Sequence, residues 1–367
     1  MCFSLGELPI SEKLILAYHT HTSDAWEAML AACAAAEQTI DVEEFVFQPD
    51  PIGERFAEVF INRAKAGVKV RLLLDWWGCK KLIGTDLLTR LTENGVDVRF
   101  FRPPSWSWVI KAPRFFPRDH RKIFIIDDTL AYTGGVCIQD SYRDWRDTMV
   151  KVRGTLVDQL KHIFDQTWHK TYGAEEEIKA HPDFTDAKNF SVYANAPDSG
   201  EHNYSNLLIK KLDNAEKSIR LVTPYFTPGD HLLTKLNEAL ARGVSVEIIL
   251  SNYSKYAPYV VGKMLSGDLI KRGAKIYYFE PTMLHLKVMI IDGNWSALGS
   301  CNLDGLSLNH NQEVMIASDD DDFTSTLMQH FEGDIKQSNR FDHRQWQHRP
   351  LSEKWMGHLL SPFSHYL

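Results

Sequence analysis

One short motif occurs twice in this chain of 367 residues, and small residues follow both copies at the same distance. The copies are His120-Arg121-Lys122 with Asp127, then Gly134-Gly135, and His285-Leu286-Lys287 with Asp292, then Gly299-Ser300. The spacings from histidine to lysine, to aspartate and to the pair of small residues are identical in the two copies. A single H-x-K-x4-D pattern is a weak match, but two copies in register are specific. They predict one site built from two halves, in which two histidines and two lysines converge on a phosphate.

The similarity between the two halves extends beyond the motifs. For example, Ala36–Ile40 matches Ala215–Ile219, and Ala66–Val70 matches Arg242–Val246. Each half predicts, in order, a helix, a strand, a second helix that stops at glycine, a second strand, another helix, a third strand and a final motif strand. The predicted helices are 24–37, 54–66, 204–217 and 230–242, and the predicted strands are Thr39–Phe47, Val68–Leu74, Val96–Phe101, Ser218–Phe226, Val244–Leu250 and Ala274–Phe279.

This alternation predicts the fold class. Strands that alternate with helices indicate βαβ units and a sheet covered on both faces. We therefore expect an α/β protein with two similar halves, mainly parallel sheets flanked by helices, and the motifs at a pseudo-twofold interface. The polar sequence near 172–190 predicts a linker, so the expected halves are residues 1–180 and 181–367.

Composition limits what the chain can bind. The net charge is −7, so the whole molecule does not attract nucleic acid, and an anion site needs locally placed positive charge. The five cysteines are widely spaced and lack a C-x-x-C pair, which predicts neither a zinc site nor a disulfide framework. We see no secretory signal and no run of about 18 apolar residues. We expect no metal and no cofactor, and we place the protein in a reducing compartment.

An aromatic and basic insertion precedes the first motif. In the second half His285 closely follows Pro281, whereas in the first half a much longer stretch separates Pro103 from His120. The insertion contains Trp106, Trp108, Phe115 and Phe116, together with Lys111, Arg114 and Arg118. Amphipathic aromatic and cationic residues suit a lipid headgroup interface, so these four aromatic residues are the candidate membrane contacts. The alternative is an ordinary packed loop with surface arginines.

The candidate catalytic residues are His120, Lys122, Asp127, His285, Lys287, Asp292 and Asn302. In a strand, residues i and i+2 share a face, so each histidine and its lysine point into one cavity. Two opposed histidines suit a two-step phosphodiester exchange: one attacks phosphorus, and the other serves as acid and then base. The lysines and Asn302 would hold the phosphoryl charge. The two aspartates lie an odd number of residues after their histidines, so they point to the other face of the strand. This indicates a structural role.

Two acids are candidates to orient the histidines. Asp147 follows His120 at nearly the same distance along the chain as Glu313 follows His285. A carboxylate beside an imidazole fixes its tautomer. The sequence does not assign either acid to a particular histidine, and the alternative is that both form surface salt bridges.

These residues resemble the phospholipase D superfamily, and in particular its cardiolipin synthase-like branch. The duplicated motif carries the superfamily resemblance. The branch resemblance rests on longer phrases: Glu44–Phe47, Asp119–Lys122, Asp144–Thr148, Thr223–Pro228 and Gly299–Asp304. The resemblance covers residues 20 to 335. It implies a phosphohistidine on His120, with His285 as general acid and base, and transfer of a phosphatidyl group between phosphatidylglycerol molecules to give cardiolipin and glycerol.

Three departures from the branch stand out. Cys137 occupies the position where the first motif usually has Asn, and Met149 replaces a residue that is often His. The membrane helices that precede many cardiolipin synthases are not seen.

Alternative functions remain open at this point. The nearest is a phospholipase D that hydrolyses phospholipid to phosphatidic acid. A nucleic-acid phosphodiesterase and a catalytically silent lipid-binding protein are less favoured, because of the net charge and the intact motifs respectively. We expect a phospholipid substrate, a peripheral position at the inner, cytoplasmic face of a membrane, no nucleic acid and no obligate protein partner.

Overall fold

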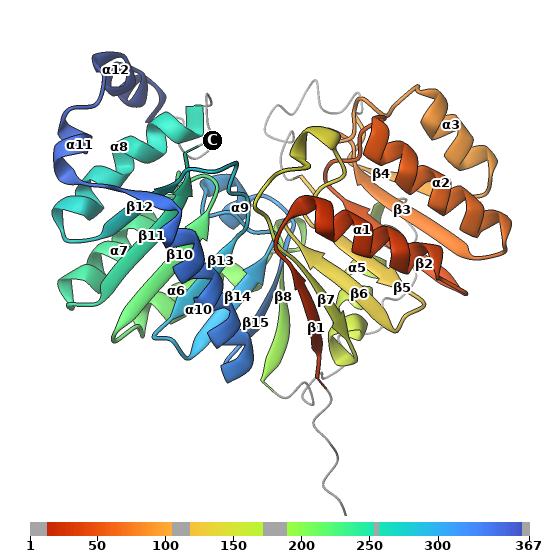
Figure 1. Ribbon diagram of the computed structural model, residues 1–367, viewed down its shortest axis with the longest axis horizontal. Coiled ribbons are helices and arrows are strands. Elements are labelled where there is room, and N and C mark those ends of the chain that lie inside the picture. The colour runs from red at the N-terminus through yellow and green to blue at the C-terminus, as the bar shows by residue number, and fades with distance from the viewer. Residues whose placement is uncertain (1–12, 105–117, 172–188, 253–256, 362–367) are drawn as a thin grey trace, which may run out of the picture.

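The computed structural model describes residues 13–104, 118–171, 189–252 and 257–361. It contains two β-sheets, each flanked by helices, that lie side by side (Figure 1). Strands from residues 15 to 153 form the first sheet, and strands from residues 190 to 341 form the second. The two predicted α/β halves are therefore present. The expected boundary at residue 180 and most of the linker lie outside the described residues.

The first sheet has the strand order β1-β7-β6-β5-β2-β3-β4. These strands are β1 (Ile15–His19), β2 (Thr39–Glu44), β3 (Lys69–Asp75), β4 (Asp97–Phe101), β5 (Ile123–Ile126), β6 (Leu130–Gly134) and β7 (Met149–Arg153). The helices of this half are α1 (Thr22–Ala34), α2 (Pro51–Lys65), α3 (Asp86–Glu93) and α5 (Thr155–Thr171), with a 3-10 turn at Asp140–Tyr142.

The second sheet has the order β16-β12-β11-β10-β13-β14-β15-β8-β9. Its strands are β8 (Phe190–Ala196), β9 (Glu201–His202), β10 (Ser218–Thr223), β11 (Ser245–Ser251), β12 (Lys275–Phe279), β13 (Val288–Ile291), β14 (Trp295–Gly299), β15 (Glu313–Ser318) and β16 (Ser338–Phe341). The helices are α6 (Asn203–Asp213), α7 (Asp230–Ala241), α8 (Ala257–Lys271), α9 (Gly305–Asn309), α10 (Asp321–Lys336), α11 (His343–Gln347) and α12 (Leu351–Leu360), with a 3-10 turn at Pro197–Ser199.

Both sheets are mixed, which corrects the expectation of mainly parallel pairing. The parallel pairs are β2·β3 and β3·β4 in the first sheet and β10·β11 and β11·β12 in the second. The motif strands β5 and β13 pair antiparallel with their neighbours on both sides. Short turns join β5 to β6 and β13 to β14, and only an antiparallel pair can close over so short a connection. The helical crossovers that enforce parallel pairing precede the motifs in each half.

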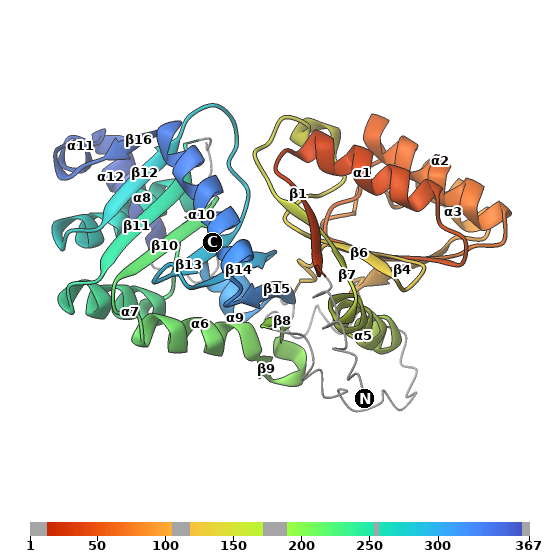
Figure 2. The ribbon, with the colours of Figure 1, turned by 60° about the horizontal axis from the view of Figure 1, so that its bottom comes forward.

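A shared apolar core joins the halves. Helices α1, α2 and α3 cover one face of the first sheet, and α6 and α7 cover the equivalent face of the second. The other two faces, with α5 and α10 (both labelled in Figure 2), contribute to one continuous cluster. This cluster includes Phe164, Phe323, Ile123 and Val288. The motif strands Ile123–Ile126 and Val288–Ile291 are fully buried within this packing. The ends of both motif strands are therefore held in a fixed relation to each other.

Candidate active site

Each motif histidine is anchored to the opposite half by backbone hydrogen bonds. The amide of His120 donates to the carbonyl of Gln312 at 3.0 Å, and the amide of Gln312 donates to the carbonyl of Arg118 at 2.8 Å. The amide of His285 likewise donates to the carbonyl of Arg146 at 2.8 Å. Two short parallel bridges, Asp119↔Gln312 and Arg146↔Leu284, thus join the halves at symmetric positions.

These bridges bring the acid of one half onto the histidine of the other. Nδ1 of His120 lies 3.0 and 3.1 Å from the two carboxylate oxygens of Glu313. Nδ1 of His285 lies 2.7 Å from Oδ2 of Asp147. All four side chains are buried, and the Ser300 hydroxyl donates a further hydrogen bond to Glu313 at 2.5 Å. Each histidine thus pairs with the acid of the other half, and we call this arrangement crossed. The sequence alone did not assign either acid to a histidine.

The two lysines lie against the histidine backbone. The ammonium group of Lys122 donates to the carbonyl of His120, and that of Lys287 donates to the carbonyl of His285. Nζ of Lys287 also lies 3.1 and 3.2 Å from the two ring nitrogens of His285. Both lysines are almost fully buried. Two buried cations beside two imidazoles make this site attractive for an anion.

Burial and the lysines set the protonation of the histidines. Burial is the main cause that lowers the pKa of His120 well below 6.5, and Lys122 and Lys287 add to the effect. Burial and then Lys287 lower the pKa of His285 to about 4. Both imidazoles are therefore neutral at neutral pH in the protein alone, and a neutral imidazole can act as a nucleophile. Burial also lowers the pKa of Lys287 to about 8.

The two acids differ in their own protonation. Burial raises the pKa of Glu313 to about 8, although Lys122 and the Ser300 hydroxyl oppose this. Burial works in the same direction on Asp147, but the contact with His285 outweighs it and holds the pKa of Asp147 below 3.8. Asp147 therefore stays ionised at neutral pH, whereas Glu313 titrates just above it.

The motif aspartates bind backbone amides and not the histidines. Asp127 accepts hydrogen bonds from the amides of Glu37, Gln38 and Thr39 at 2.7 to 2.9 Å. Asp292 accepts the equivalent bonds from residues 216, 217 and 218 at 2.7 to 2.9 Å. Both aspartates have a left-handed backbone, with φ of 52° and 54°. Each carboxylate ties the end of its motif strand to the segment that opens the neighbouring strand, β2 or β10.

The residues that follow the motifs shape the acid sites. A Cβ atom at Gly135 would lie 2.2 Å from Oδ1 of Asp147, so only glycine fits there. Asn302 is buried, and its Oδ1 has no hydrogen-bond partner among the described residues. Cys137, the equivalent of Asn302 in the first half, is buried, and its thiol helps to lower the pKa of Glu44, which burial raises.

Two aromatic rings that sequence reasoning did not assign to the site flank the histidines. The ring of Phe45 packs edge-on against His120, with centroids 4.8 Å apart. The ring of Trp145 lies 5.0 Å from His285 in a tilted arrangement. Both residues occur in the phrases that carry the family resemblance, Glu44–Phe47 and Asp144–Thr148, so a signal was present. These rings restrict the movement of the imidazoles.

The predicted membrane contacts, metal sites and membrane-spanning helices can be compared only with the described residues. Trp106, Trp108, Phe115 and Phe116 lie outside them. In the described ranges, no group of three or more His, Cys, Asp or Glu side chains could hold a metal ion. Over the same ranges, no helix has both the length and the apolar character needed to cross a bilayer.

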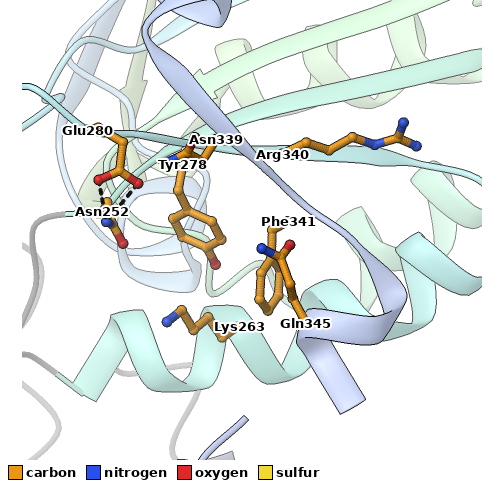
Figure 3. A pocket seen from close by; sticks show the side chains of 8 residues that line it. All are labelled: Asn252, Lys263, Tyr278, Glu280, Asn339, Arg340, Phe341 and Gln345. Carbon is orange, nitrogen blue, oxygen red and sulfur yellow. Dashed lines mark hydrogen bonds between the residues drawn. The ribbon is translucent and has the colours of Figure 1, made fainter. Parts of the chain in front are cut away.

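A polar cavity of about 460 Å³ lies in the second half between α8, β12 and β16 (Figure 3). Neither motif histidine is among the residues that line it: Asn252, Lys263, Tyr278, Glu280, Asn339, Arg340, Phe341 and Gln345.

The duplicated fold and the paired H-x-K motifs define a phospholipase D-like protein. Residues 29–168 and 208–335 match the family described as "Cardiolipin synthase, PLD-like domain". The chain belongs to this family.

Curated relatives agree with this assignment, and a solved structure shares the fold. The chain is 30% identical to a cardiolipin synthase of Geobacillus sp. (strain WCH70), covering 98% of this chain and 74% of that protein. It is 31% identical to cardiolipin synthase 2 of Bacillus anthracis, covering 98% and 72%. The crystal structure of the Haemophilus influenzae Rd KW20 phosphatidylserine synthase shares the fold, with a TM-score of 0.75 at 14% identity over 96% of this chain and 94% of that one.

Proposed function

We propose that this protein transfers a phosphatidyl group between two phosphatidylglycerol molecules, which gives cardiolipin and releases glycerol. The observation that carries the proposal is the crossed pair of contacts, His120 with Glu313 and His285 with Asp147, in a chain of the cardiolipin synthase family. In its ionised form, each acid accepts a hydrogen bond from Nδ1–H of its histidine, which leaves Nε2 available for chemistry.

In the first step, Nε2 of His120 attacks the phosphorus of a phosphatidylglycerol molecule. The bond from phosphorus to the headgroup oxygen breaks, and the leaving glycerol takes a proton from His285. The pKa of His285 is about 4 in the protein alone, and an adjacent phosphodiester anion favours its protonated form. The phosphatidyl group is then held on His120 by a phosphorus–nitrogen bond.

In the second step, a hydroxyl of another phosphatidylglycerol headgroup gives its proton to His285 and attacks phosphorus. The bond to His120 breaks, and cardiolipin leaves. In both steps, Lys122 and Lys287 offset the negative charge that the phosphoryl oxygens gain in the transition state. Asn302 is a candidate third donor to the same oxygens.

Hydrolysis is the nearest alternative. If water replaced the second headgroup, the same residues would produce phosphatidic acid, as a phospholipase D does. A nucleic-acid phosphodiesterase is less favoured, because the net charge of −7 opposes a nucleic-acid substrate.

A peripheral position at the cytoplasmic face of the membrane is part of the proposal. A substrate that resides in a bilayer requires the enzyme to reach that surface. The four described cysteines are free and buried, which suits a reducing compartment.

The test is incubation of the purified protein with phosphatidylglycerol vesicles, without added metal, followed by mass spectrometry of the lipids. We expect cardiolipin with an equal amount of glycerol, and the His120→Ala variant serves as the control. Phosphatidic acid alone would identify a hydrolase, and no product from this lipid would overturn the proposal.

A further inference from the structure

Exposed apolar side chains gather on two segments of this protein. Seven large hydrophobic residues are exposed in the described ranges. Four of them, Leu351, Trp355, Met356 and Leu359, lie on α12, and two, Trp77 and Ile83, lie in the segment 76–85 between β3 and α3. Leu16 on β1 is the seventh. Single exposed apolar residues are ordinary, but a concentration of this kind marks an interaction surface.

The α12 helix presents one continuous apolar stripe. Leu351, Trp355 and Leu359 follow one another at intervals of four residues and are 72–77% exposed. At ~100° per residue, these three residues and Met356 span about 140° of the helix circumference. Ser352 is the one other residue within this arc, and the arc contains no carboxylate. The opposite side is fixed, because Gly357 packs on Met264 of α8 and Glu353 lies 3.8 Å from Lys263.

The segment 76–85 combines apolar and cationic groups. Trp77 and Ile83 are each 40% exposed, and Lys80 and Lys81 are exposed between them. The ammonium group of Lys80 lies 4.1 Å from the centroid of the Trp77 ring. No acidic residue occurs in this segment. Tryptophan beside lysine suits the boundary between acyl chains and anionic headgroups.

Both segments are connected to the candidate active site. A Cβ atom at Gly78 would lie 1.9 Å from the carbonyl of Phe45, the residue whose ring packs on His120. In the second half, α8 supports α12 and follows β11, whose last residue, Ser251, hydrogen-bonds the amide of Leu284 beside His285. Each segment is thus linked to one histidine of the pair. In Figure 1, α12 and α3, the helix that follows the segment 76–85, lie toward opposite upper corners of the view.

We propose that α12 and the segment 76–85 together form the surface through which this protein docks on an anionic phospholipid bilayer. This rests on the proposed function, because a bilayer is then the source of the substrate. A bilayer is broad enough to contact two patches on different halves. A second protein copy fits less well, since a stable interface needs about 800 Å² from each partner and α12 is only about 15 Å long.

The first test measures co-sedimentation of the full chain with vesicles of phosphatidylglycerol and phosphatidylcholine. The Leu351→Ser/Trp355→Ser/Leu359→Ser variant should bind at least about tenfold more weakly than the wild type. Leu16→Ser is the matched control, because it also removes an exposed leucine, and it should bind as the wild type does. Circular dichroism and thermal unfolding verify that the variants are folded. Unchanged binding by the folded triple variant would overturn the proposal.

The second test separates charge from apolar contact. The Lys80→Gln/Lys81→Gln variant should lose about fivefold in binding to phosphatidylglycerol vesicles for each lysine removed, and its binding should depend less on salt. Binding to vesicles of phosphatidylcholine alone should not change. An equal loss on both kinds of vesicle would contradict the electrostatic part of the proposal.

Two further readouts distinguish this surface from the proposed function. Activity on phosphatidylglycerol dispersed in detergent micelles should be similar in the triple variant and the wild type, while activity on vesicles falls. If the wild type binds vesicles through α12 but turns over no phosphatidylglycerol in either form, the surface stands and the function fails. If the triple variant only abolishes a dimer, as seen by analytical ultracentrifugation, and vesicle binding persists, the surface is wrong.

Discussion

Nδ1 of His120 lies 3.0 Å from the Glu313 carboxylate, although 193 residues separate the two in the chain. The equivalent contact of His285 with Asp147 spans 138 residues. Each half therefore supplies the histidine of one pair and the acid of the other. Neither half contains a complete pair, so the arrangement of the two sheets is itself part of the candidate active site.

The contact between His120 and Glu313 predicts a pH dependence. Glu313 must be ionised to accept the Nδ1 proton, and its raised pKa of about 8 means that activity should rise as pH increases toward 8. Lys287 has a lowered pKa of about 8, so its charge, and with it activity, should fall above that value. We expect a bell-shaped profile of kcat/KM with its maximum near pH 8.

Substitution of Glu313 tests this assignment. Glu313→Gln retains a hydrogen-bond acceptor without a titratable charge, so the acidic limb should disappear and the rate should fall by about 10- to 100-fold. Asp147→Asn should retain the acidic limb, because the pKa of Asp147 lies below 3.8. An unchanged acidic limb in Glu313→Gln would assign it to another group.

The two histidines should behave differently when removed. His120→Ala should abolish activity, because no nucleophile remains to form the covalent intermediate. His285→Ala should slow both steps, and we expect the enzyme with the phosphatidyl group on His120 to accumulate when the leaving group of the substrate needs no proton. Mass spectrometry of the quenched protein measures the adduct. Its appearance in His120→Ala instead would reverse the roles.

Cys137 should contribute little to the chemistry. Burial raises the pKa of its thiol well above 9, so it is not a thiolate at neutral pH. Cys137→Ser keeps a hydrogen-bond donor near the Glu44 carboxyl and should retain activity within about threefold of the wild type, whereas Cys137→Ala removes this donor and should lose more. Steady-state kinetics of the Cys137→Ser and Cys137→Ala variants tests this expectation. An inactive Cys137→Ser variant would indicate a direct role for the thiol.

Asp127 should matter for stability more than for turnover. Asp127→Asn replaces a carboxylate that accepts three amide hydrogen bonds, and we expect the free energy of unfolding to fall by about 2–4 kcal/mol. The folded fraction should keep its kcat. Urea unfolding and kinetics on the same samples check both statements, and loss of kcat without loss of stability would contradict them.

The effect of Asp127 also has a pH signature. Burial opposes the shift, but the three amides lower the pKa of Asp127 below 3.8 in the folded protein. The stabilisation is therefore present above 3.8 and is lost as pH falls through the lower folded value. The stability difference between wild type and Asp127→Asn should narrow in that acidic range.

Many elements of the fold were predictable from local pattern. The helix expected at 54–66 is α2, Pro51–Lys65, and the strand expected at Val68–Leu74 is β3, Lys69–Asp75. Pro and Gly residues at the ends of these elements act on the backbone within a few residues. The ends of each element can therefore be predicted from one short segment of sequence. Pairing direction was not readable in this way. The expected parallel arrangement is wrong for β5 and β13, because short turns, and not helices, connect them onward.

The sequence alone shows that the chain is duplicated. It also shows that each half carries one motif histidine, one motif lysine and one candidate acid to orient a histidine. Matching spacings in two copies are enough for that, because they can be read along the chain without knowledge of its folding. The contacts of Glu313 with His120 and of Asp147 with His285 are visible only in the folded protein. That pairing depends on backbone contacts, such as His120 with Gln312, between strand ends that are distant in sequence. Such contacts exist only after the two sheets have packed on their shared apolar core.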